Sequence, residues 1–263
     1  MSFDPTKPMA GDIQVIENAL IVPFGEGKVR GARRPAGIYD AAGNYLPMGQ
    51  CLRNSSAPIT VQPDRMPENV ENVIAGTWLF GGILYSHFGH FLAETTSRMW
   101  ALDHLPVPVD GMIFVPRKQV SWPLRFMRPI MHFLEMFGPA AAASTAIVAP
   151  TRVERLVLGP QGFGTGDMMG GSPEYRAFIR KNFGADIAAD GAENIYISRK
   201  QLFSKRGRYF GEAHIESLFE AEDYRIFHPQ DHSVAEQIAQ YKAAKRIVSS
   251  DSSALHLAAF FSD

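Results

Sequence analysis

The stretch LYSHFGHFLAETTSRMWALDH (84–104) carries side chains suited to acid–base chemistry inside a segment that is otherwise strongly apolar. At 100° per residue, four of its polar residues fall at roughly 0°, 300°, 340° and 20° around an α-helix, so they share one stripe. They are His87, His90, Glu94 and Arg98. Buried polar groups need partners, and buried charges need them more, so the stripe is either satisfied by protein or lines a cleft.

Three interpretations of this stripe remain open. His at i and i+3 with Glu at i+7 could converge on one metal ion, but two turns is a long span for three ligands, and no His or Cys cluster offers a fourth. Alternatively, Glu94 pairs with Arg98 while the histidines bond to backbone. We favour a cleft-lining helix on which His90, Glu94 or His87 removes a proton or holds a hydroxyl group, with no bound metal.

A second group of chemistry-bearing residues follows the strand-like run NIYIS, in the segment SRKQLFSKRGRYFGE (198–212). A guanidinium group can bind phosphate through two parallel hydrogen bonds, so an arginine at the carboxyl end of a strand suits a diphosphate. We expect this role for Arg199. Lys200 and Lys205 are interpreted as part of a solvated basic loop.

The third group lies in RIVSSDSSALHLAAFF (246–261), where a strand runs through a small polar turn into an apolar helix. The first N–H groups of a helix, together with its dipole, can bind an anion, and Ser252 and Ser253 are small enough to admit a phosphate or a ribose. Helix capping by Asp251 or Ser252 would explain the same residue types. His256 lies either at this site or in the core.

The elements that position these groups alternate between strands and helices. Residues 1–72 are β-rich and irregular, with a hairpin at IYDAAGNYLP, whereas strand–helix alternation in the remainder predicts an α/β fold with a mainly parallel sheet. Such units bind nucleotides at the carboxyl ends of their strands. A small polar stretch, GADIAADGAEN, marks a domain boundary. The predicted parts are 1–72, a lead-in packed on the first domain; 73–188, an α/β domain; and 189–263, a Rossmann-like half.

Composition narrows the class of protein. A formal net charge of −1 over 263 residues leaves no basic excess for a general nucleic-acid binder. Cys51 is the only cysteine, which favours a reducing compartment. The first residues have neither a basic nor an apolar signal region, and no apolar run approaches the length of a spanning helix. We therefore expect a cytoplasmic protein.

Taken in order, four segments of the chain resemble glycosyltransferase family 61, whose bacterial members include capsular-polysaccharide biosynthesis proteins. The resemblance covers roughly residues 70–263. It rests on HFGHFLAETTSRMWAL, on the ISR of 197–199 with a downstream basic pair and Glu212, on HPQDHSVAEQI, and on the loop and helix of DSSALHLAAF.

The resemblance implies a GT-B-like fold, with two Rossmann-like α/β domains facing a cleft. It also implies inverting, metal-independent transfer of a sugar from a nucleotide-sugar co-substrate to a glycan or lipid-linked acceptor, without a further cofactor. Peripheral membrane contact would suit a lipid-linked acceptor. His90 or Glu94, with His87, would act on the acceptor hydroxyl. The expected donor-site residues are Arg199, Arg206, Ser252, Ser253 and Glu212, and further cleft residues are Arg98, Asp251 and His256.

The chain departs from the family pattern at three places. It has Ser250, Asp251 and Ser252 where the family usually has glycine in the turn, and Gly211 where Asn usually precedes the glutamate. Asp251 would repel a diphosphate unless it caps the helix or bonds the ribose. The sequence also stops after its third αβ unit, whereas a nucleotide-binding half continues for about two or three more strands. We therefore expect a truncated chain or a reduced relative.

Two rival functions follow from these features. The departures at the donor segment would also suit a noncatalytic module that binds a nucleotide or a glycan. The His/Glu stripe would suit a metal-dependent hydrolase, which predicts stoichiometric bound metal after purification.

Overall fold

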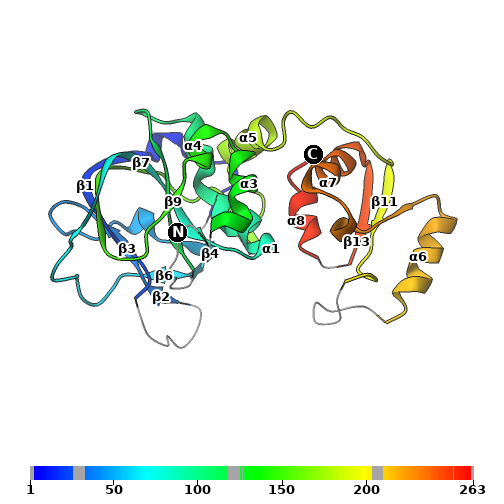
Figure 1. The fold of residues 1–263 in the computed structure, drawn as a ribbon, viewed down its shortest axis with the longest axis horizontal. Helices are drawn as coiled ribbons and strands as arrows, with labels where there is room; N and C mark the ends of the chain where they lie inside the picture. The colour runs from blue at the N-terminus through cyan, green and yellow to red at the C-terminus, as the bar shows by residue number, and fades with distance from the viewer. Residues whose placement is uncertain are drawn as a thin grey trace. The chain divides into compact units, whose positions relative to one another are not determined.

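The structure, a computed structural model, describes residues 3–25, 33–117, 125, 127–202, 210–250 and 252–261. The chain divides into two compact units, Met1–Phe183 and Gly184–Asp263, and each is described by itself (Figure 1). Both contain strands and helices, so the protein belongs to the mixed α/β class.

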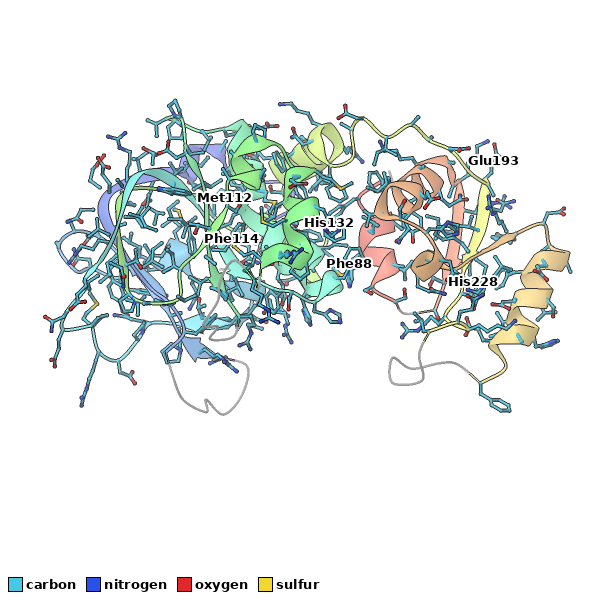
Figure 2. The ribbon with its side chains drawn as sticks, in the orientation of Figure 1. Phe88, Met112, Phe114, His132, Glu193 and His228 are labelled. Carbon is cyan, nitrogen blue, oxygen red and sulfur yellow. The ribbon has the colours of Figure 1, made fainter. Side chains whose placement is uncertain are left out.

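The first unit is built on a six-stranded mixed sheet. The strands, in spatial order, are β3 (Gly37–Tyr39), β1 (Gln14–Val22), β10 (Thr151–Leu158), β7 (Asn72–Leu84), β8 (Gly111–Pro116) and β9 (Thr145–Ala146). The last four run parallel, and β1 is antiparallel to both of its neighbours. The predicted lead-in therefore supplies two strands of this sheet. Every residue of β8 is buried, as expected for a strand covered on both faces, and Met112 and Phe114 lie inside the unit (Figure 2).

Short elements complete the N-terminal part of the first unit. They are η1 (Ala10–Asp12), η2 (Pro47–Gly49), the parallel pair β2 (Arg34–Pro35) and β6 (Thr60–Val61), and the antiparallel pair β4 (Leu52–Asn54) and β5 (Ala57–Pro58). The predicted hairpin is confirmed: Tyr39 and Tyr45 form an antiparallel bridge. Gly43 sits in this turn with φ +85°, a conformation that favours glycine.

The predicted single helix over 84–104 is wrong in detail. The structure has a short α-helix, α1 (Phe88–His90), then a π-helical segment, η3 (Phe91–Thr95), then a 3₁₀ segment, η4 (Thr96–Asp103). Hydroxyl side chains bond to backbone carbonyls through this region, with Thr96 Oγ1 2.6 Å from Leu92 O and Ser97 Oγ 2.8 Å from Glu94 O. Such bonds compete with the regular helical pattern. Because π and 3₁₀ turns differ from 3.6 residues, the assumed stripe does not persist past Thr95.

Five further helical elements are described in this unit. They are η5 (Arg128–Ile130), α3 (Met131–Glu135), α4 (Pro139–Ala142), η6 (Gly166–Met168) and α5 (Pro173–Asn182). The segment PLRFMRPIMHFLEMFG (123–138) predicts a helix that restarts at Pro129 and stops at Gly138, and η5 and α3 agree with both where the residues are described. The Ser172 hydroxyl caps α5 by accepting a hydrogen bond from Tyr175 N at 3.1 Å. Helix α5 packs against η4 and so holds the irregular helix on the sheet.

The second unit confirms the predicted β–α–β–α–β–α alternation. Its three parallel strands lie in the order β12 (Arg225–Phe227), β11 (Asn194–Ile197), β13 (Arg246–Ser249). The helical elements are α6 (Glu212–Ala221), η8 (Pro229–Asp231), α7 (Val234–Ala243) and α8 (Ala254–Ala258). A capping box between Ser233 and Glu236 begins α7. All three strands point their carboxyl ends to one edge, which gathers the residues that follow them.

Candidate functional site

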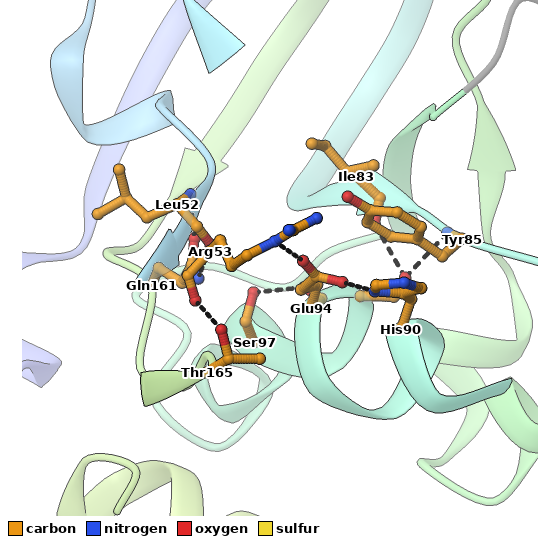
Figure 3. A network of polar contacts seen from close by, with 10 residues as sticks. Leu52, Arg53, Ile83, Tyr85, His90, Glu94, Ser97, Gln161 and Thr165 are labelled. Atoms are coloured by element: carbon orange, nitrogen blue, oxygen red, sulfur yellow. Dashed lines mark hydrogen bonds and ion pairs between the residues drawn. The ribbon is translucent and has the colours of Figure 1, made fainter. Parts of the chain in front are cut away.

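Glu94 is the centre of a polar network in the first unit, although only 5% of the residue is exposed. Its Oε2 lies 2.5 Å from His90 Nδ1, and its Oε1 accepts a hydrogen bond from Arg53 Nε at 3.4 Å. Arg53 and His90 approach the carboxylate from opposite sides (Figure 3). The side chains of both are 45% exposed. A buried carboxylate thus orients two groups that reach solvent.

His90 is held in a defined orientation by its neighbours. Its ring stacks on Tyr85 with centroids 5.0 Å apart, and the His87 ring contacts it edge-on with centroids 5.3 Å apart. Since the Glu94 carboxylate engages Nδ1, a neutral His90 carries its proton there and leaves Nε2 as an acceptor. This pairing is the one by which a carboxylate fixes a catalytic imidazole as a general base.

The backbone of Tyr85 is held by Thr95, the last residue of the π-helical segment η3. Thr95 Oγ1 accepts a hydrogen bond from Tyr85 N at 3.0 Å and donates one to Ile83 O at 2.9 Å. Burial raises the pKa of the Tyr85 hydroxyl, as does the charge of Glu94, while the charges of Arg117 and Arg53 oppose the shift. The phenol therefore stays neutral beside His90 at ordinary pH.

Arg53 reaches Glu94 because its backbone is fixed by a loop far along the chain. The side-chain amide of Gln161 bonds to both backbone groups of Leu52, as a neighbouring β-strand would. It accepts a hydrogen bond from Leu52 N at 2.9 Å and donates one to Leu52 O at 2.7 Å. Thr165 then donates to Arg53 O from its amide at 2.7 Å and its hydroxyl at 3.1 Å. Sequence analysis missed Arg53 and Gln161, because they lie in segments without periodicity and meet only in the folded chain.

Arg98 is not in the same environment as the rest of the predicted stripe. It is 1% exposed, and it donates to three carbonyl oxygens, those of Gly159 at 3.1 Å, Met48 at 2.9 Å and Gln50 at 2.8 Å. Gly82, with φ +95°, leaves room for the guanidinium: a Cβ there would lie 3.1 Å from Arg98 Nη1. The structure therefore corrects both the cleft-lining role and the Glu94–Arg98 pairing, and gives Arg98 the task of tying the 48–50 turn to the core.

The second unit has its own polar cluster, where β11 and β12 end. Glu216 of α6, 6% exposed, accepts hydrogen bonds from Ser198 Oγ and Lys200 Nζ, both at 2.7 Å. It also lies 3.6 Å from the Nε2 atom of His228, which is labelled in Figure 2. Burial alone would raise the pKa of the Glu216 carboxyl, but the hydrogen bonds from Lys200 and Ser198 hold it below its ordinary value. Bonding to Glu216 raises the pKa of Lys200 in return.

Glu212 fixes the end of β11 instead of facing solvent. It is 3% exposed, and its Oε1 accepts hydrogen bonds from Tyr196 OH at 2.8 Å and from Arg199 N at 3.2 Å. These contacts hold the backbone from which the Arg199 side chain extends. Among the other predicted donor-site residues, Arg206 and Asp251 lie outside the described residues.

The serine turn before α8 favours the capping interpretation. Ser252 Oγ accepts a hydrogen bond from Ala254 N at 3.1 Å. This bond satisfies the first backbone N–H of α8, a helix of five residues. The Ser253 side chain makes no capping bond. His256 is exposed, which excludes the core alternative.

Three residues of the second cluster were also missed or undervalued by sequence analysis. Lys200 was interpreted as a solvated loop residue, yet it pairs with a buried carboxylate. Glu216 was detectable as the residue four positions after Glu212 on one helix face. His228 was detectable because it directly follows a strand of a parallel sheet.

Two searches of the described part of the chain complete the account of the site. No group of three or more His, Cys, Asp or Glu side chains in it is arranged to hold a metal ion. None of its helices combines the length and the apolar character needed to cross a bilayer.

Comparison with models of protein families identifies a match. A model of the family described as Glycosyltransferase 61 matches residues 88–263, about two thirds of the chain. The matched segment includes His90 and Glu94 and the whole second unit, whereas Arg53 and Tyr85 precede it. No curated protein matches the sequence.

Proposed function

Because the chain belongs to glycosyltransferase family 61, we propose that it transfers a sugar from a nucleotide-sugar to a hydroxyl group of a saccharide or lipid-linked saccharide. The transfer inverts the anomeric carbon and needs no bound metal or further cofactor. The observation that carries this proposal is the oriented His90, whose Nδ1 lies 2.5 Å from the buried Glu94 carboxylate and whose side chain is 45% exposed.

The proposed step is a single displacement. His90 Nε2 accepts the proton of the acceptor hydroxyl while its oxygen forms a bond to the anomeric carbon. The bond from that carbon to the phosphate oxygen breaks, and its electron pair leaves with the diphosphate. Glu94, bonded at Nδ1, stabilises the imidazolium that forms. Attack opposite the leaving group accounts for inversion.

The leaving diphosphate requires positive charge and hydrogen-bond donors. We assign this charge and these donors to the second unit. There Arg199 follows β11, and the next residue, Lys200, donates a hydrogen bond to Glu216. Parallel α/β units bind nucleotides at this edge of the sheet, which supports the assignment. Arg206 remains a prediction from sequence. An acceptor-side first unit and a donor-side second unit would correspond to the GT-B organisation.

A binding experiment tests the donor half of this proposal. The purified chain is melted with a panel of nucleoside diphosphates and nucleotide-sugars, with and without chelator. A nucleotide at about 100 times its dissociation constant stabilises the folded state by about 2.7 kcal/mol, a readily measured rise in melting temperature. We expect a rise with one nucleotide that persists with chelator and is lost in Arg199→Ala.

The control variant is Arg152→Gln, on β10 of the first unit, which should keep the nucleotide response. If no nucleotide raises the melting temperature, the chain has no working donor site, and the noncatalytic binding of a glycan becomes the better account. If the rise needs a divalent metal, the metal-independent mechanism is wrong.

A further inference from the structure

Arg53 offers two hydrogen-bonding groups that the described protein does not use. Its Nε is bonded to Glu94 Oε1, and neither Nη atom has a partner among the described residues. The side chain is 45% exposed. In the close view, the guanidinium lies beside the Glu94 carboxylate and points in the direction of Tyr85 (Figure 3). It is therefore a cation held at one edge and open at the other.

The backbone of Arg53 is held by more hydrogen bonds than an arginine needs merely to neutralise Glu94. Four hydrogen bonds from Gln161 and Thr165 hold residues 52 and 53 in place. Gln161 is only 7% exposed, so its amide is committed to this task. A guanidinium presented on a fixed backbone loses less freedom when it binds a ligand.

The contact with Glu94 is also not the one that best neutralises a carboxylate. Arginine pairs most strongly with a carboxylate through two parallel N–H bonds. Here a single Nε contact of 3.4 Å is used, and the other carboxylate oxygen is taken by His90. Glu94 therefore aims the guanidinium while leaving its Nη groups for another anion.

The surroundings favour a negatively charged ligand. Arg117 and Arg53 both act electrostatically on Tyr85, whereas Glu94 is the carboxylate that acts on it. The His90 ring stacks on Tyr85, and the His87 ring contacts that of His90. The guanidinium of Arg117 lies over the Phe24 ring at 5.7 Å. The two guanidinium groups outnumber the one carboxylate beside the partly exposed His90, so the local charge attracts an anion.

We propose that Arg53 binds an anionic group of the acceptor, a carboxylate or a phosphate, next to the hydroxyl that His90 deprotonates. The acceptor is then an acidic or phosphorylated saccharide. This inference rests on the proposed function, because it takes His90 as the base. The Glu94 carboxylate binds both the Arg53 guanidinium and the His90 imidazole. An acceptor whose anionic group binds the Arg53 Nη atoms therefore has its neighbouring hydroxyl directed at His90 Nε2.

The test compares three monosaccharides that differ in charge. Binding of methyl β-glucuronide, glucose 6-phosphate and methyl β-glucoside to the full chain is measured by ligand-observed NMR, without any donor. We expect at least one anionic sugar to bind about tenfold more tightly than the glucoside, a difference of about 1.4 kcal/mol. Comparison of the glucuronide with the phosphate distinguishes the two sources of the anion.

Variants show whether Arg53 is responsible. Arg53→Gln should abolish the preference for the anionic sugar, and Arg53→Lys, which keeps the charge without the fork, should retain part of it. Arg152→Gln is the matched control and should keep the full preference. Melting curves of each variant confirm that it is folded.

Three results would overturn the inference: equal binding of anionic and neutral sugars, no binding of any of the three, or an unchanged preference in folded Arg53→Gln. The proposed function is tested by other measurements, nucleotide binding and sugar transfer, so its failure can be distinguished from failure of this inference. A charge preference without any transfer would leave Arg53 as an anion site in a protein that is not a transferase.

Discussion

At the scale of single residues, the site rests on one buried carboxylate that orients two exposed groups. The sequence places His90 and Glu94 on one helical face, four residues apart, and the structure joins them by a hydrogen bond that the sequence analysis did not predict. Arg53 could not be predicted in the same way. It precedes Glu94 by 41 residues and contacts it only because Gln161, a further 67 residues on, pairs with Leu52. Local spacing carries no information on such a contact.

Glu94→Gln tests the role of this carboxylate. The variant keeps the shape and a hydrogen-bonding oxygen but loses the charge that stabilises the imidazolium of His90. We expect kcat for sugar transfer to fall by about 10²- to 10⁴-fold. Glu135→Gln, an exposed carboxylate of α3, is the control and should transfer at the wild-type rate. Equal rates for the two variants would remove Glu94 from the mechanism.

At the scale of elements, regular strands were predictable and the irregular helix was not. The apolar runs at 72–82 and 111–116 predict strands that form most of β7 and all of β8, and Ser172 followed by Pro173 predicts the start of α5. The α1–η3–η4 segment fails the simple periodic rule because three hydroxyl residues, at 95–97, bond to carbonyls. That failure is why Arg98 leaves the stripe while His90 and Glu94 stay on it.

A double-mutant cycle tests what holds this irregular helix in place. Thr96 Oγ1 donates to Leu92 O, so Tyr175 OH of α5 donates to Thr96 Oγ1, at 2.7 Å. Thr96→Val removes both bonds, and we expect it to lower the free energy of unfolding by about 1–3 kcal/mol.

Adding Tyr175→Phe to the Thr96→Val protein should lower the free energy of unfolding by less than Tyr175→Phe does alone, because the two hydroxyls share one hydrogen bond. Chemical denaturation of the four proteins measures the coupling. Strict additivity would show that the Thr96–Tyr175 bond does not hold η4 to α5.

At the scale of the whole molecule, the N-terminal segment is part of the first unit's structure. Glu174, on the first turn of α5, accepts hydrogen bonds from Met9 N at 2.6 Å and Ala10 N at 3.2 Å. Burial would raise the pKa of this carboxyl, but these bonds and others to its neighbours hold it below its ordinary value. Sequence alone gave no sign of this contact across 165 residues.

The lowered pKa makes the N-terminal attachment dependent on pH. The unfolded chain binds a proton at Glu174 more readily than the folded chain, so this contribution is complete above about pH 4.3 and is lost as the pH falls through the lower folded pKa. We expect the protection of the Met9 and Ala10 amides, measured as their exchange rate relative to the intrinsic rate at the same pH, to fall over that range. Glu174→Gln should exchange faster at neutral pH and show a weaker pH dependence. Identical profiles for the two proteins would mean that Glu174 does not anchor this segment.

The central claim, that His90 is the base of a sugar transfer, is tested most directly by comparing transfer rates of wild type and His90→Ala at saturating donor and acceptor. We predict a fall in kcat of about 100-fold or more, with the nucleotide-induced rise in melting temperature retained. His104→Ala, another exposed histidine of the first unit, should transfer normally. A folded, nucleotide-binding His90→Ala protein that transfers sugar at the wild-type rate would contradict the account.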